Sequence, residues 1–239
     1  MATFVQTAVE TLISEFDVSA DHNAVALVLS NEHKDSTRYG HSARAATPGL
    51  TKWVATGEGY NDFADDALDE RLFGKIGLAG ELLTIAPLGA SVTQVAYFGE
   101  AVQGEYTPVG DDVGELLAFR WSAEGSGANG MIRGSVVFNA QPSSSGNGTA
   151  FQLGAVSATQ RVYLGLHFIG ASAAITVTLA SDSVEGFGGS PETQITAVVQ
   201  SAPGHQFLSA AGEITDDWWR LEYTTGGGSF DIIALVGIQ

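Results

Sequence analysis

The five histidines are the first candidates for chemistry, because imidazole can act as a general base or a metal ligand near neutral pH. They are His22, His33, His41, His167 and His205, and none has the HExxH spacing of a zinc-binding helix. His167 falls in the apolar stretch HFIG, where we expect a packed or surface residue rather than a ligand. The chain also lacks Gly-x-Ser-x-Gly and P-loop motifs, and no helix pattern follows its Gly-x-Gly-x-x-Gly string GSGANG, as a dinucleotide-binding motif requires. We therefore predict no catalytic, cofactor-binding or metal-binding residues, and no enzymatic activity.

Three pairs of adjacent aspartates are candidate calcium ligands: Asp65–Asp66, Asp111–Asp112 and Asp216–Asp217. Adjacent side chains on a strand point to opposite faces, and no pair has the DxDxDG spacing of a calcium-binding loop. Helix capping and turn solvation are the favoured roles.

The adjacent tryptophans Trp218 and Trp219 could form a platform on which a sugar ring stacks. If their segment is a strand, Trp219, Leu221 and Tyr223 share one face and Trp218 lies on the other. This pattern favours a core position for Trp219 and a sheet-edge or subunit contact for Trp218. A sugar platform would need an exposed aromatic face beside hydrogen-bonding side chains, so it is the less favoured alternative.

Composition favours a strand-and-turn protein without disulfides or thiolate metal sites. The 239 residues include 30 glycines and no cysteine, with 44% apolar and 15% charged residues. The formal net charge of −17 disfavours tight binding to nucleic acid. The first 16 residues contain no basic residue, and no apolar run approaches the length of a membrane span, so we expect neither a secretory signal nor a membrane segment.

Most segments alternate apolar and polar residues with a period of two, which predicts half-buried strands. The exception is the segment 64–77, where apolar residues recur four apart on one helical face: Ala64, Leu68, Leu72 and Ile76. Aspartates would occupy the first turn of this helix, and Gly77 follows as its C-cap. Residues 9–16 fit either a helix or a strand. The GEGY and GGGS segments are predicted to be turns, because no basic residue or helix start follows them to hold a phosphate.

Strand patterns recur about one hundred residues apart. A constant offset of 102 residues separates Leu117, Phe119 and Trp121 from Trp219, Leu221 and Tyr223. Further upstream the offset becomes 109, which a tandem duplication with the helix lost from the second copy would produce. The alternative is that β-proteins contain many similar strands. We predict two β-domains, residues 1–140 and a possible diverged repeat at 141–239, joined near NAQPSSSGNGT.

An ordered set of features over roughly residues 9–139 resembles the tail tube (major tail) proteins of long-tailed bacteriophages and related viruses. The features are a strand-turn-strand, a polar loop, PGLTKW opening a strand, the acidic helix and YTPVGDDVGE. The second half, with QLGAVSATQRVYLGLHF and ITDDWWRLEYT, resembles the C-terminal portion of similar phage structural proteins.

The resemblance implies an all-β, tail-tube-like β-sandwich or barrel with one flanking helix, located in the virion tail after synthesis in the host cytoplasm. Strands of neighbouring copies would join into a ring of three or six chains, and stacked rings would form a tube with other virion tail proteins. Genome DNA would pass through without specific binding. The loop around Glu32–Ala46 would be the arm that reaches an adjacent ring. A capsid decoration or other accessory virion protein and a carbohydrate-binding β-sandwich are the alternatives.

Overall fold

The computed structural model describes residues 8–40, 42–65, 67–110, 112, 115–170, 174–227 and 230–239. These residues form strands, one α-helix and one short 3-10 helix (Ser19–Asp21), so the predicted all-β class with a single substantial helix is confirmed. The chain divides into two compact units. The larger unit contains Met1–Ala20, Glu81–Glu100 and Met131–Gln239, and the smaller unit contains Asp21–Gly80 and Ala101–Gly130.

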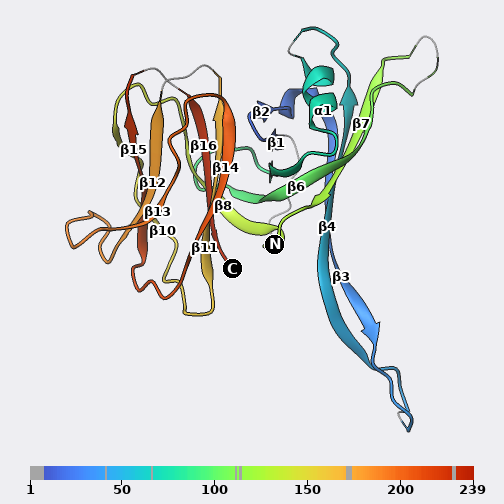
Figure 1. Cartoon of the computed structure of the whole chain (residues 1–239), viewed down its shortest axis with the longest axis horizontal. Coiled ribbons are helices and arrows are strands. Elements are labelled where there is room, and N and C mark those ends of the chain that lie inside the picture. The colour runs from blue at the N-terminus through green and yellow to red at the C-terminus, as the bar shows by residue number, and fades with distance from the viewer. Residues whose placement is uncertain are drawn as a thin grey trace. The chain divides into compact units, whose positions relative to one another are not determined.

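The larger unit contains strands of two sheets (Figure 1). The first sheet has the order β14-β11-β16-β8-β6-β5-β1-β2, and the second has the order β10-β15-β12-β13, with β9 also paired to β15. The first-sheet strands on this path are β1 Glu10–Ile13, β2 Phe16–Asp17, β5 Ala79–Ala86, β6 Val95–Thr107, β8 Ile132–Ala140, β11 Arg161–Ile169, β14 Gly204–Ala211 and β16 Asp231–Ile238, and β3, β4 and β7 of the same sheet lie off it. The second-sheet strands are β9 Gly146–Asn147, β10 Phe151–Gln152, β12 Ile175–Asp182, β13 Glu192–Thr196 and β15 Trp218–Thr225.

Strand β16 is buried on both faces and separates two cores. Its residues 232, 234 and 236 pack with Leu179 and Trp219 of the second sheet. Its residues 233 and 235 point the other way and pack with Leu12 and Phe98. Because side chains alternate along a strand, a strand covered on both faces must be apolar throughout, as the run IIALV is.

The smaller unit contains β3 (His22–Asp35), β4 (Ala46–Tyr60), β7 (Ala118–Gly125), the C-terminal half of β6 and the helix α1 (Leu68–Lys75). Strand β4 pairs with β3 on one side and β7 on the other, and β7 also pairs with β6. The helix is held against β6 by Gln103. Its side-chain N–H donates to the Leu72 carbonyl at 2.9 Å, and its backbone carbonyl accepts from the Gly77 N–H at 2.9 Å.

The helix is shorter than the predicted 64–77. The chain before it forms a turn in which Ala67 N donates to the Ala64 carbonyl, and Ala67 itself is extended, so the helix begins only at Leu68. Leu68 and Leu72 are buried as predicted, but Ala64 and Ile76 are exposed. Gly77 follows the helix with φ of +75°, consistent with its predicted role.

The prediction that GEGY forms a turn is wrong, because these residues are the last four of β4. Both glycines are needed for close packing. A Cβ on Gly57 would lie 2.4 Å from Trp121 Nε1, and a Cβ on Gly59 would lie 1.8 Å from the Asp21 carbonyl oxygen. In the GGGS segment, Gly227 has φ of +104° in a bend, while residues 228 and 229 lie outside the described residues.

Replacing Gly59 with alanine is expected to destabilise the protein by about 1–3 kcal/mol, because the new methyl group overlaps backbone atoms that cannot rotate away. Gly104→Ala is the matched control, since nothing lies within 4 Å of a Cβ at that position. Denaturant unfolding of the two variants measures the difference. Equal free energies of unfolding would contradict the close approach at Gly59.

Strand pairing does not follow the predicted repeat. Strand β7 pairs with β4 and β6, whereas β15 pairs with β12, β10 and β9. The offset of 109 places Leu29 of β3 over Phe138 of β8 and Trp53 of β4 over Val162 of β11. Strands β3 and β4 pair with each other, but β8 and β11 are separated by β16. A tandem duplication would give strands 114–122 and 216–224 equivalent neighbours, and this expectation is wrong. The division of the chain into 1–140 and 141–239 stays a prediction.

Candidate assembly surface

The outer half of the β3–β4 hairpin is a two-stranded ribbon. Residues 54–59 of β4 pair with both β3 and β7. Beyond them, β3 and β4 pair only with each other, from Leu29 opposite Trp53 to Asp35 opposite Ala46 (Figure 1). We call residues 29–53 the outer hairpin. The predicted loop around Glu32–Ala46 falls here, although Glu32–Asp35 continue β3 and the connecting segment is 36–45.

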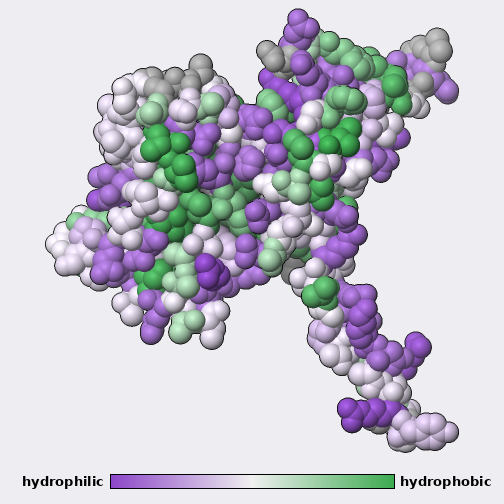
Figure 2. Space-filling view, viewed as in Figure 1, coloured by the Kyte–Doolittle hydropathy of each residue, from purple (hydrophilic) through white to green (hydrophobic). Residues whose placement is uncertain are grey.

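Large apolar side chains of the outer hairpin lie in solvent. Leu29 is 58% exposed, Leu50 is 82% exposed, and Tyr39 near the tip is fully exposed. Figure 2 shows a hydrophobic group toward the base of this hairpin and mostly hydrophilic or intermediate residues beyond it. An isolated two-stranded hairpin is at best marginally stable in water. The outer hairpin would therefore gain stability from a partner that covers it.

The tip of the outer hairpin is basic in an acidic chain. Residues 34–44 contain three basic side chains, Lys34, Arg38 and Arg44, and one acidic side chain, Asp35, which gives a net charge of +2 against −17 for the whole chain. Arg44 Nε lies 3.7 Å from an Asp35 carboxylate oxygen, and the Arg44 side chain is 91% exposed. Such an exposed pair is weak, so the guanidinium can be offered to another surface. The charge favours an acidic partner.

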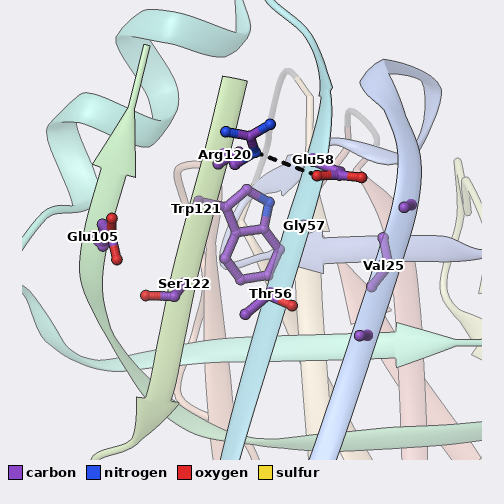
Figure 3. Close-up of a pocket in the computed structure, with 10 residues that line it drawn as sticks. Val25, Thr56, Gly57, Glu58, Glu105, Arg120, Trp121 and Ser122 are labelled. Atoms are coloured by element: carbon purple, nitrogen blue, oxygen red, sulfur yellow. Dashed lines mark hydrogen bonds and ion pairs between the residues drawn. The ribbon is translucent and has the colours of Figure 1, made fainter. Parts of the chain in front are cut away.

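A pocket of about 430 Å³ lies along the inner half of the same hairpin (Figure 3). Trp121 lies over Gly57 on its floor and donates Nε1–H to His22 Nε2 at 2.6 Å. At the rim, Arg120 Nε lies 3.4 Å from a Glu58 carboxylate oxygen. The pocket and the outer hairpin share strands β3 and β4, and together they form the candidate assembly surface.

The prediction that Trp219 is a core residue is confirmed. Its side chain is fully buried in the core between the two sheets, and Nε1–H donates to the Gly154 carbonyl at 3.0 Å. Tyr223 is half-buried against Phe138, with ring centroids 5.3 Å apart. Trp218 is half-buried on the opposite face of β15. Trp219 therefore has no face open to a sugar ring.

His167 is a packed core residue, one of the two positions, packed or surface, that the sequence left open. Its ring is fully buried, Nδ1–H donates to the Ser14 carbonyl at 2.6 Å, and the Thr84 hydroxyl lies 2.8 Å from Nε2. Burial lowers the pKa of His167 to about 4, because the charged ring would lose its hydration. The ring is neutral at pH 7 and satisfied by two hydrogen bonds.

His167 is expected to make the folded state less stable as the pH falls from 6.5 to 4. Above pH 6.5 the ring is neutral in both states, whereas below it the unfolded chain binds a proton that the folded protein excludes, which costs about 3 kcal/mol by pH 4. His167→Gln lacks this titration, so its free energy of unfolding should fall less over the same range. Urea unfolding at several pH values measures both slopes, and identical slopes would contradict the lowered pKa.

The structure does not bring the remaining candidates together into one site among the described residues. His33 is exposed on β3, and His41 lies outside the described residues. Asp216 accepts a hydrogen bond from the Ser181 hydroxyl at 2.7 Å, and the carbonyl of Asp217 accepts from Leu153 and Gly154.

The other two aspartate pairs are described only in part. Asp65 is exposed before the helix, and Asp66 and Asp111 lie outside the described residues. Sequence reasoning missed the basic tip of the hairpin, which the charge distribution along the chain could have indicated. It also missed a cluster of Glu15, Glu81 and His205, for which no sequence spacing gives a signal.

Among the described residues, no helix has the length and apolar character needed to cross a membrane.

No protein-family model matches the chain, and no curated protein matches it. Solved structures do resemble it. The tail of an empty gene transfer agent (GTA) particle, with C6 symmetry, is 16% identical over 49% of this chain and 91% of that chain, with a TM-score of 0.39. The SPP1 tail tube is 13% identical over 53% of this chain and 76% of that chain, with a TM-score of 0.41.

The SPP1 Dit protein, of the hub adsorption apparatus in phages that infect Gram-positive bacteria, is 10% identical over 98% of this chain and 100% of that chain, with a TM-score of 0.40. These are tail proteins, the class that the sequence resemblance indicated. At identities below 25% and TM-scores below 0.5, the likeness is one of strand arrangement and assigns neither a partner nor an activity to this chain.

Proposed function

We propose that this protein is a non-enzymatic virion structural protein that assembles with copies of itself into stacked rings, forming a tail tube through which the genome passes. The outer hairpin is the observation that carries the proposal. It is a long two-stranded ribbon with exposed Leu29, Leu50 and Tyr39, and no third strand pairs with it in the part of the chain that the structure describes. A neighbouring copy in an adjacent ring would cover these side chains.

Charge supports a second copy as the partner of the outer hairpin. The segment 34–44 has a net charge of +2, so the rest of the chain carries −19. The basic tip of one copy therefore finds complementary charge on the body of another copy, which favours both encounter and orientation. The same acidity suits a passage that DNA must cross without adhering to it.

A ring of six chains fits the strand pairing better than a ring of three. A ring of three would need two equivalent tube-forming domains in each chain, and the pairings of β7 and β15 are not equivalent. If the tube has six-fold symmetry, as in the gene transfer agent tail, a chain with a single tube-forming sheet requires six copies per ring.

Sedimentation velocity over a range of concentrations tests the proposal in solution. We expect a discrete ring species that grows into much larger, polydisperse particles as the concentration rises. A capsid decoration protein would instead remain small until it meets a capsid shell, and a hub at the end of a tail would stop at the ring. A carbohydrate-binding module would remain a small species and would bind on a glycan array.

A further inference from the structure

We propose that Glu15, Glu81 and His205 form a binding site for one divalent transition-metal ion such as Zn²⁺. A carboxylate oxygen from each glutamate and a ring nitrogen of the histidine all lie within 4.8 Å of one another, and all three residues are half-buried. They come from three separate segments of the larger unit. Glu15 lies in the turn between β1 and β2, Glu81 lies in β5, and His205 lies in β14.

Ser14 organises the frame around this cluster. Its hydroxyl donates to a carboxylate oxygen of Glu81, its backbone N–H donates to the Leu82 carbonyl at 2.8 Å, and its carbonyl accepts from His167 Nδ1. The backbone next to Glu15 and the carboxylate of Glu81 are therefore held by the same residue. Hydrogen bonds of this kind orient metal ligands and raise affinity.

The strand register places His205 on the correct side of the sheet. His205 is directly opposite His167 in the β11–β14 ladder, and residues directly opposite each other project from the same face. His167 contacts Ser14 from that face, next to Glu15. The pairing of β14 with β11 thus brings the imidazole of His205 to the two glutamates.

The mixture of ligand atoms selects the class of ion. Mg²⁺ and Ca²⁺ prefer oxygen ligands alone, whereas Zn²⁺ and its neighbours accept imidazole together with carboxylates. Three protein ligands and one water complete a tetrahedral Zn²⁺ site, in which bonds of about 2.0–2.2 Å place ligand atoms roughly 3.4 Å apart. Small rotations of the half-buried side chains provide this spacing. The ion would also offset the charge of two adjacent carboxylates.

Metal binding would link distant strands of the first sheet of the larger unit. In the order β14-β11-β16-β8-β6-β5-β1-β2, His205 belongs to the first strand, Glu81 to the sixth, and Glu15 to the turn that joins the last two. One ion would therefore tie both ends of this sheet together. The site does not depend on the proposed tail-tube function.

Titration of the full-length protein with Zn²⁺, after dialysis against a chelator, tests the site. We expect one ion bound per chain, a rise in melting temperature that Mg²⁺ at the same concentration does not produce, and an unfolded fraction reduced about 100-fold when free Zn²⁺ is 100 times Kd. If the three side chains only contact one another, millimolar Zn²⁺ will give neither heat nor a melting shift. That result would overturn the proposal.

Variants assign the bound ion to these residues. Glu81→Gln and His205→Gln should each weaken Zn²⁺ binding by at least about tenfold, while His33→Gln, which removes an exposed imidazole on β3, should leave it unchanged. Unchanged binding in both site variants would overturn the proposal. If a variant does not fold, NMR of the histidine rings in the wild-type protein decides, since Zn²⁺ must shift the His205 signals and not those of His33.

Discussion

Replacing Trp219 with alanine is expected to lower the free energy of unfolding by about 3–5 kcal/mol, the usual cost of emptying a buried aromatic site. The indole is fully buried among the side chains of both sheets of the larger unit, and its N–H is bonded to the Gly154 carbonyl. The substitution removes that packing and leaves the carbonyl without its indole donor. Thermal and denaturant unfolding measure the loss, which should appear as failed folding rather than as failed ligand binding.

Trp218→Ala is the matched control for Trp219→Ala. Trp218 is the preceding residue on the same strand, but its side chain is half-buried on the opposite face. Its loss should be milder for the isolated chain, and more severe for assembly if that face meets a neighbouring copy. A sugar platform makes the reverse prediction, with normal stability in both variants and weaker glycan binding. Equal and negligible melting shifts would contradict the core position of Trp219.

Reversing the charge of the hairpin tip is expected to abolish tube growth while leaving the fold intact. The triple variant Lys34→Glu, Arg38→Glu and Arg44→Glu changes the net charge of residues 34–44 from +2 to −4. The tip would then repel the acidic body of the next copy, and juxtaposed like charges cost several kcal/mol at an interface. Quantitative light scattering at matched concentrations measures tube growth.

A second triple variant separates the loss of attraction from the added repulsion in this experiment. Glutamine at the same three positions removes the positive charge without adding repulsion, so growth should be weakened rather than lost. Increasing salt should weaken growth of the wild type and partly restore the glutamate variant, because screening reduces attraction and repulsion alike. Tubes of unchanged length from the glutamate variant, with a melting temperature like that of the wild type, would contradict a role for the basic tip.

Local sequence pattern predicted the elements that depend on neighbouring residues. The alternation of Trp219, Leu221 and Tyr223 placed the correct face of β15 in the core, and the spacing of Leu68 and Leu72 placed the helix. The helix boundaries were less accurate, because Ala67 adopts an extended conformation that the four-residue spacing does not reveal.

Features that depend on distant residues were not predictable from one sequence. The glycines of GEGY indicated a turn, but they lie in a strand, where the close approach of Trp121 and of the Asp21 backbone leaves no room for a Cβ. The equivalent strand pairing expected from a repeat failed for a related reason, since similar strand patterns do not determine which strands pair. Glu15, Glu81 and His205 come together only because distant segments of the first sheet meet at Ser14 and His167.

Negative-stain electron microscopy of the concentrated purified protein tests the central claim most directly. The account predicts open-ended tubes built of stacked rings, with shorter particles that are single rings of six chains at lower concentration. Monomers that remain dispersed at every concentration would contradict self-assembly, and rings that never stack would contradict the tube.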